Sequence, residues 1–236
     1  MVLGCIIAVL MVLIAPAFTS LKSAGDVTSA AYTIKGVLDT ARTYAKANNT
    51  YTWVGFFEED ISSATPGTPG SGRVVMSIIA SKDGTMLYTG NLTTNVVLDQ
   101  PIPCPLIQVG KLVKTDNMHL KGFTAPTTTP PPDSFDTRPP FTSAAAQIGD
   151  TGYPPNPALS FRYPVGSSSP QYTFTKVVQF SPRGESVITN NTYTFARISE
   201  IGVEPTHGAV VPSSTPANVV AIQFNGFAGD VRIYRR

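Results

Sequence analysis

The chain has 236 residues, a formal net charge of +2 and a charged fraction of 14%, well below the roughly 25% of typical soluble domains. Lys and Arg are scattered along the sequence, so the positive charge is too small and too dispersed for a nucleic-acid partner. Thr, Ser, Pro, Gly and Asn are abundant, which favours an exported protein. The length suits one helix of about fifty residues followed by one all-β domain.

The first 21 residues contain no charged side chain. At about 1.5 Å of rise per residue, a helix of this length could just cross a hydrocarbon core of roughly 30 Å. A signal peptide is an alternative, because Ala15-Pro16-Ala17 before Phe18 has the small residues of a cleavage site, although no basic residue precedes the apolar run. A plain membrane anchor is another.

A second pattern follows without a break. Over residues 22–49 the apolar side chains recur at steps of three and four residues with polar side chains between them, which predicts an amphipathic helix. Asn48 and Asn49 predict its end, because Asn tolerates the left-handed conformation of a helix terminus. The apolar positions that we expect to pack on the rest of the protein are Val27, Ala30, Ala31, Ile34, Val37, Leu38, Ala41, Tyr44 and Ala45.

The remainder, residues 50–236, has the patterns of an all-β domain. Asp83-Gly84 predicts a hairpin between strands at 74–80 and 85–88, and Thr and Pro dominate residues 124–140, which predicts an exposed extended loop. Other strands are expected at 51–57, 95–98, 106–109, 159–163, 172–180, 185–188, 219–224 and 231–234. The expected fold class is α+β, a long N-terminal helix packed on an all-β antiparallel domain.

Three stretches of the chain resemble the type IV pilin-like proteins, and within them the minor pseudopilins of the GspH/FimT type. The first is the apolar run at 1–10 followed by Ala15-Pro16-Ala17-Phe18, and the second is residues 38–48 with their Ala, Arg and Asn pattern. The third consists of Phe180-Ser181-Pro182-Arg183-Gly184 and the closing residues 229–233. Residues 64–160 carry no such likeness.

The resemblance implies a structural subunit of a type II secretion or type IV pilus filament. Its helix would have a membrane half at 1–21 and an amphipathic half at 22–49, with the C-terminal domain periplasmic or extracellular. The implied location is the bacterial inner membrane, single-pass, and the implied partners are that membrane and other pilin or pseudopilin subunits. The residues of the membrane and assembly helix would be Gly4, Ile7, Ala8, Leu10, Leu13 and Pro16.

One departure from the family lies at the start of the chain. Pilin precursors begin with a short basic leader that ends in Gly and is followed by Phe-Thr-Leu-x-Glu, and this sequence shows neither. We therefore expect the true start codon to lie upstream of Met1. In that case prepilin peptidase would be a further partner.

The sequence offers no candidate residues for catalysis, a cofactor or a metal. His119 and His207 each lack a second ligand three or four residues away and are expected to be exposed loop histidines. Asp150-Thr151-Gly152 spells the aspartic-protease triplet but lacks the apolar strand that should lead into its Asp. The acidic run Glu58-Glu59-Asp60 is expected to be a solvated loop rather than a calcium site.

Two other functions remain open at this point. A membrane-tethered exported β domain could bind a glycan or a surface partner through the Pro/Thr loop and aromatic residues such as Tyr153. An exported enzyme would require an unrecognised site in the central region. The two cysteines, Cys5 and Cys104, are not expected to form a disulfide, because Cys5 lies in the uncharged first segment.

Overall fold

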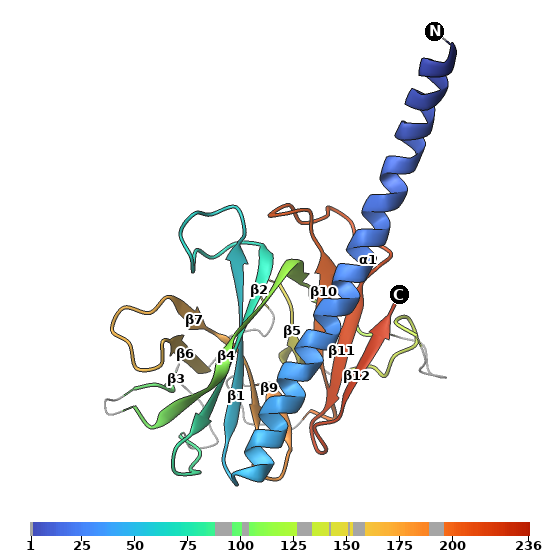
Figure 1. The fold of residues 1–236 in the computed structure, drawn as a ribbon. Coiled ribbons are helices and arrows are strands. Elements are labelled where there is room, and N and C mark those ends of the chain that lie inside the picture. The colour runs from blue at the N-terminus through green and yellow to red at the C-terminus, as the bar shows by residue number, and fades with distance from the viewer. Residues whose placement is uncertain are drawn as a thin grey trace.

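A computed structural model describes residues 2–87, 96–100, 104–126, 134–141, 143–150, 152, 159–188 and 196–236, with side chains from Gly25 onward except that of Ala144. The chain forms a helix followed by β strands, with one short 3-10 helix (Figure 1). The helices are α1 (Val2–Ala47) and η1 (Ala144–Ala146). The strands are β1 (Thr52–Asp60), β2 (Gly72–Ser81), β3 (Val96–Val97), β4 (Leu106–Leu120), β5 (Gln147–Ile148), β6 (Leu159–Tyr163), β7 (Tyr172–Phe174), β8 (Lys176–Phe180), β9 (Ser186–Ile188), β10 (Ile198–Pro205), β11 (Val220–Asn225) and β12 (Val231–Arg235).

The larger sheet has nine strands in the order β12-β11-β10-β4-β2-β1-β8-β9, with β5 paired to β10. Strand β4 joins its two halves, because it pairs with β2 up to Met118 and with β10 over Met118–Leu120. The register of β4 against β2 shifts where Met76 pairs with Val113 and Ile78 with Val109. Gly110, with a positive φ of 75°, lies in this bulge and bends the strand.

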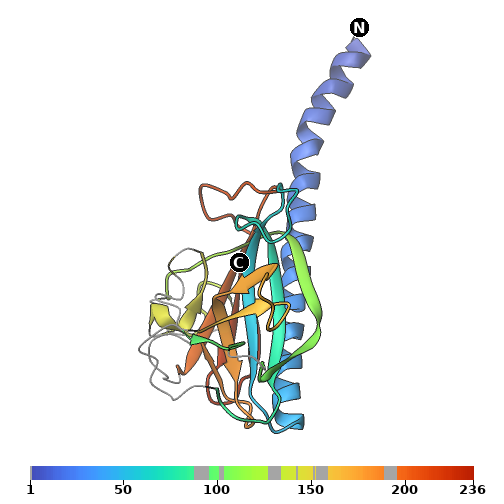
Figure 2. The same ribbon diagram turned by 90° about the vertical axis from the view of Figure 1, so that its left-hand side faces the viewer.

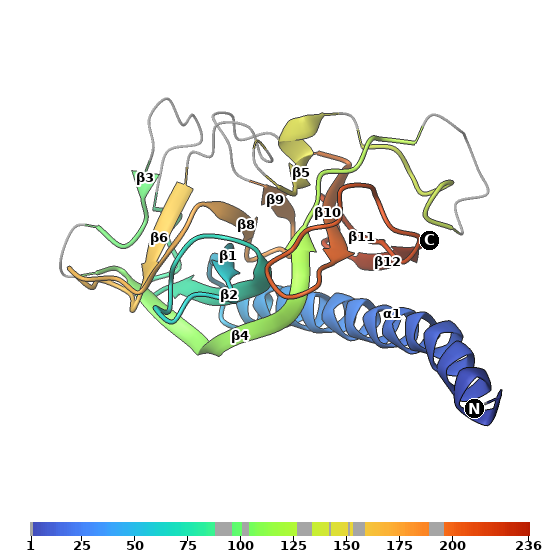
Figure 3. The ribbon, with the colours of Figure 1, turned by 90° about the horizontal axis from the view of Figure 1, so that it is seen from above.

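The helix and a smaller sheet lie on opposite faces of the larger sheet (Figure 3). The smaller sheet has the order β3-β6-β7. Its Phe161 and Phe174 stack with ring centroids 4.9 Å apart over Gly55 of β1, where an added Cβ would lie 2.5 Å from both side chains. Gly55 is therefore required for the close approach of the two sheets.

Alternating residues of β1 build the two cores. Val54 and Phe56 belong to the core under α1, whereas Trp53 belongs to the core under the smaller sheet. Trp53 is fully buried and donates its indole N–H to Gln179 Oε1 at 2.8 Å. The polar Gln179 inside an apolar strand thus has a structural use.

The expected fold class, a long membrane-plus-amphipathic helix on an all-antiparallel domain, is wrong. Only a short part of α1, residues 25–47, has described side chains, and this part packs on the sheet. The sheets are mostly but not wholly antiparallel, because β5 pairs with β10 and β3 with β6 in parallel. These parallel pairs involve two-residue strands, which are too short to be recognised from alternation.

The expected single-pass location in the bacterial inner membrane is also contradicted. Within the described side chains, no helix combines the length and the apolar character needed to cross a bilayer. The physical reason is visible in residues 25–47, where Asp26, Lys35, Asp39, Arg42 and Lys46 interrupt the apolar positions.

Two strand predictions near β2 need correction. β2 does not form a hairpin with residues 85–87, because its partners are β1 and β4. Asp83 instead closes a local turn by accepting from Ser81 Oγ, Thr85 N–H and Thr85 Oγ1. The strand expected at 106–109 extends to Leu120, and residue 88 of the expected hairpin lies outside the described residues.

Candidate functional site

The candidate functional site is the seam where α1 packs on the larger sheet, together with the helix surface that the sheet leaves uncovered. Eight of the nine positions expected to pack on the domain are buried in the core under α1: Val27, Ala30, Ala31, Ile34, Val37, Leu38, Ala41 and Ala45. Tyr44 is half-buried and lies at the edge of this seam. The spacing of three and four residues therefore marks the face of α1 that meets the sheet.

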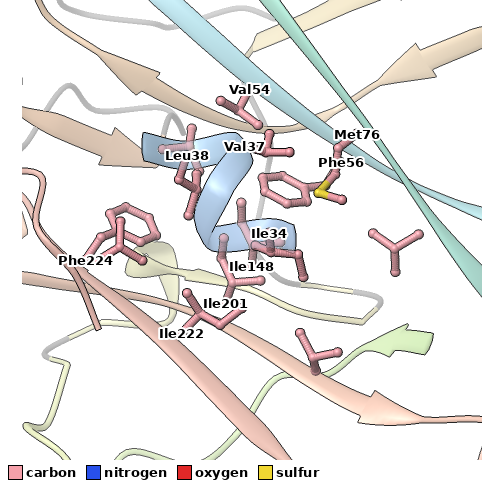
Figure 4. Packing of buried hydrophobic residues seen from close by; sticks show 14 of the residues in the cluster. Ile34, Val37, Leu38, Val54, Phe56, Met76, Ile148, Ile201, Ile222 and Phe224 are labelled. Atoms are coloured by element: carbon pink, nitrogen blue, oxygen red, sulfur yellow. The ribbon is translucent and has the colours of Figure 1, made fainter. Parts of the chain in front are cut away.

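Figure 4 shows how the seam is filled. Ile34 and Leu38 are fully buried, and they belong to the same core as Phe56 of β1, Ile201 of β10 and Ile222 of β11, all of which are labelled in Figure 4. Burial of one such side chain stabilises the fold by about 1.5 to 3 kcal/mol. The four alanines of the seam let the helix backbone lie close to the strands.

Polar contacts fix the end of the helix against two turns. Arg42 pairs with Asp230 at 3.5 Å, and Thr52 Oγ1 donates to Ala41 O at 3.0 Å. A Cβ added to Gly184 would lie 3.0 Å from the Lys46 side chain, and one added to Gly229 would lie 2.3 Å from Gly184 O. Both glycines also have positive φ, so the two turns approach α1 only because they carry glycine at these positions.

The opposite face of α1 is not covered by the domain. Its exposed side chains are mostly small: Gly25, Ser29, Tyr32, Gly36, Thr40 and Thr43. Thr33 and Thr40 donate their hydroxyls to the carbonyls of Ser29 and Gly36, which satisfies these groups within the helix. The large side chain of this face is Tyr32, which is 59% exposed and whose ring centroid lies 5.3 Å from Cζ of the Arg235 guanidinium.

Residues 2–24 continue the helix beyond the end of the sheet (Figures 1 and 2). The expected assembly residues Gly4, Ile7, Ala8, Leu10, Leu13 and Pro16 belong to this segment. Their backbone is helical through Pro16, and their side chains lie outside the described residues. The backbone of Cys5 is also helical, and its side chain also lies outside the described residues.

The acidic run Glu58-Glu59-Asp60 is not a solvated loop, because it ends strand β1 and two of its carboxylates are buried or half-buried. Glu58 Oε1 lies 2.6 Å from His119 Nδ1 and accepts from Leu120 N–H at 2.9 Å, and Glu58 Oε2 accepts from Lys176 at 3.0 Å. Burial opposes ionisation, but the contacts with His119, Lys176 and Leu120 lower the pKa of Glu58 below its ordinary value. The expectation of an exposed loop histidine at His119 is also wrong.

Glu59 lies on the other face of β1 and accepts four hydrogen bonds. Its donors are Gly67 N–H, Tyr172 Oη, Arg73 Nη1 and Lys114 Nζ, at 2.7 to 3.2 Å. Burial opposes the charge, but these four donors lower the pKa of Glu59 to about 2. Glu59 is thus an ionised structural carboxylate that ties the smaller sheet and the loop after β1 to β2 and β4.

A third buried charge pair was not predicted from the sequence. Arg138 donates from Nε to Glu200 Oε2 at 2.6 Å and from Nη2 to Glu200 Oε1 at 3.0 Å, and both side chains are almost fully buried. Gln147 and Gln223 also donate to Glu200. Arg138 follows the centre of the predicted Pro/Thr loop, so this pair anchors the end of that loop on the sheet face opposite α1. The centre of the loop, residues 127–133, lies outside the described residues.

Asp150, His207 and Cys104 complete the set of residues that the sequence singled out. Asp150 pairs with Lys121 at 3.1 Å, His207 is exposed in a turn, and Cys104 is a free, half-buried cysteine. Thr151 and Tyr153 lie outside the described residues. Among the described side chains, no group of three His, Cys, Asp or Glu is arranged to hold a metal ion.

The chain was compared with protein-family models, with curated proteins and with solved structures, and none of the three comparisons finds a match. The pilin-like interpretation therefore depends on the residues that carry the resemblance.

Proposed function

We propose that this protein is a structural subunit, a minor pilin or pseudopilin, that assembles with further copies and related subunits through its N-terminal helix. One observation carries the proposal. A single helix, α1, has two parts with different surroundings: residues 25–47 are packed on the sheet, whereas the uncharged residues 2–21 extend beyond it (Figure 1).

The composition of residues 2–21 supports an assembly role. This segment holds no charge and is rich in Val, Leu, Ile and Ala, and a helix of such residues is not stable alone in water. Packing against the same segment of neighbouring subunits would cover this apolar surface. Gly4 and Ala8, four residues apart, would permit close helix contact.

The packing of residues 25–47 on the sheet also supports a role in assembly. A helix that transmits contacts between subunits must be held rigidly by its own domain, and α1 is held by the buried seam and by the Arg42–Asp230 contact. The three buried charge networks support a structural protein as well, because Glu58, Glu59 and Glu200 are engaged by basic or amide side chains of the fold.

The proposal is tested by self-association of the full chain in detergent-free buffer, measured by sedimentation velocity and electron microscopy. The wild-type chain is expected to form large assemblies, and Ala8→Glu is expected to abolish them, because a charge would be placed in the uncharged segment. Val97→Glu is the matched control, since Val97 is 38% exposed on β3, and should assemble like the wild type. A wild-type chain that stays monomeric, or an Ala8→Glu chain that assembles equally well, would contradict the proposal.

A further inference from the structure

The two halves of the larger sheet meet in a short ladder between β4 and β10 (Figure 3). The paired residues are Met118–Leu120 of β4 and Val203–Pro205 of β10. One backbone hydrogen bond of 2.9 Å continues the ladder at each end, from Lys121 N–H to Gly202 O and from Thr206 N–H to Asn117 O. We call residues 117–121 and 202–206 the sheet join. Because few backbone bonds hold the sheet join, an unfavourable charge beside it should lower its local stability.

Charged and titratable side chains from both halves gather at the sheet join, and we call them the join cluster. They are Glu58 of β1, His119 of β4, Lys121, Asp150, Lys176 of β8 and Glu204 of β10. Glu58 contacts His119 at 2.6 Å and Lys176 at 3.0 Å, and Lys121 pairs with Asp150 at 3.1 Å. Glu204 lies directly opposite His119 in the ladder. The join cluster therefore connects β1 and β8 of one half with β10 of the other.

The join cluster lacks one positive charge when its histidine is neutral. Glu58, Asp150 and Glu204 supply three carboxylates, whereas Lys121 and Lys176 supply two ammonium groups. Glu204 is the carboxylate without a partner, because it is 1% exposed and its Oε1 atom accepts no hydrogen bond from the described residues. A buried charge without a partner is costly, and one bound proton would remove it.

His119 and Glu204 are the two groups that can hold this proton. Burial opposes ionisation of Glu58, but the hydrogen bond from His119 and the charge of Lys176 lower its pKa, so its carboxylate accepts from His119 Nδ1–H. Nε2 is then the imidazole nitrogen that takes up an added proton. Burial also raises the pKa of Glu204, against Lys121 and His119, which favours its neutral acid. In either place the proton leaves the join cluster without net charge.

We propose that Glu58, His119 and Glu204 form a proton-dependent latch, which keeps the sheet join closed while the join cluster holds the added proton and lets it open locally when the proton is lost. The closed join binds the proton more tightly than the open join, in which Glu204 is solvated. Closure is therefore favoured at low pH and weakens as the pH rises, by at most about tenfold in the opening equilibrium per pH unit for one proton. This device does not depend on the proposed assembly role.

The latch is tested by hydrogen–deuterium exchange of the full chain between about pH 5 and pH 8, resolved to single amides and corrected for the intrinsic exchange rate. We expect the protection of the Lys121 and Thr206 amides to fall by about tenfold or more across this range. The Ser81 amide, which donates to Tyr51 O at 3.0 Å beside the β1–β2 ladder, is the internal control. Its protection should stay constant.

Glu204→Gln removes the buried charge and should keep the Lys121 and Thr206 amides equally protected across the pH range. Glu185→Gln is the matched control, because Glu185 accepts from Ser181 Oγ at 2.7 Å and does not belong to the join cluster, so this variant should retain the pH dependence of the wild type. The inference is overturned by constant protection of the two amides in the wild type, by an equal fall at Ser81, or by an unchanged pH dependence in Glu204→Gln. If Glu204→Gln does not fold, the wild-type comparison with Ser81 still tests the latch.

Discussion

Glu204 lies directly opposite His119 where β10 pairs with β4, and among the described residues its Oε1 atom is buried without a hydrogen-bond partner. Burial raises the pKa of Glu204, and the nearby carboxylates of Asp150 and Glu58 act in the same direction against Lys121 and His119. The Glu204–His119 pair lies where the two halves of the larger sheet are joined. The protonation state of Glu204 therefore affects how stably these halves are held together.

The substitution Glu204→Gln is therefore expected to stabilise the protein at neutral and alkaline pH. A raised pKa favours folding below the pKa of the unfolded state, and this contribution is lost as the pH rises through the folded pKa. The variant should match the wild type near about pH 4 and exceed it by about 1 kcal/mol near about pH 8. Urea unfolding across this range measures the difference.

The control for that experiment is Glu185→Gln. Glu185 Oε2 accepts a hydrogen bond from Ser181 Oγ, so the same chemical change there should not add stability. A Glu204→Gln variant less stable than the wild type at alkaline pH would mean that Glu204 holds a favourable ionised contact.

Glu59 should behave in the opposite way. Its lowered pKa, about 2, contributes stability that is present above the unfolded value of 4.5 and is lost as the pH falls toward 2. Glu59→Gln is expected to cost on the order of 3 kcal/mol at pH 7, with the difference from the wild type shrinking in acid. Chemical denaturation of the wild type and of the Glu59→Gln variant, between about pH 2 and pH 7, measures this difference in the free energy of unfolding.

Asp116 gives the matched comparison for Glu59, because both carboxylates contact Arg73. The Asp116 side chain is 51% exposed, so Asp116→Asn should cost less than about 1 kcal/mol. Equal losses at the two positions would show that burial does not set the strength of the Glu59 network.

Leu38 tests the helix seam. Leu38→Ala removes a fully buried side chain from the core under α1 and should lower the free energy of unfolding by about 2 to 5 kcal/mol. Thr40→Ala changes the exposed face of the same helix turn, where the hydroxyl only contacts Gly36 O, and should change stability by less than about 0.5 kcal/mol. Thermal unfolding of the two variants measures both changes in stability. Similarly small effects of the two substitutions would contradict the packing of α1 on the sheet.

Arg138 tests the anchor of the loop before η1. Arg138→Ala leaves Glu200 as a buried charge without its main partner and should cost about 3 to 5 kcal/mol. Residues 134–141 should then be cut more readily in limited proteolysis. Arg162→Ala is a useful contrast, because Arg162 is 20% exposed and pairs with Asp99 elsewhere in the fold. Cleavage at 134–141 in that variant would show that any loss of stability opens the loop.

The seam was predictable because the period of an α-helix places residues three and four apart on one face, as for Ile34 and Leu38. The final hairpin of β11 and β12 was predictable for a similar reason, since both alternation and the turn are local signals. The second half of β4 was missed, because residues 110–117 are mostly polar and include Gly110. Its strand state is imposed by pairing with β2, which lies far away in the sequence.

The buried charge networks could not be predicted for a related reason. Arg138 and Glu200 are 62 residues apart, and Glu58 and His119 are 61 apart, so no spacing connects either pair. Glu58-Glu59-Asp60 was interpreted as solvated because charged residues are seldom buried unless they are paired. One available signal was the continuation of the apolar strand directly into the acidic run.

The central claim is that residues 2–21 are covered by neighbouring copies of the chain. Met11 lies within this segment, and its oxidation by peroxide reports solvent access to its side chain. We predict that the oxidation rate of Met11 in the full chain falls several-fold as protein concentration rises, while that of Met86 in the β domain stays constant. Oxidation of Met11 at a rate that is fast and independent of concentration would contradict assembly through this helix.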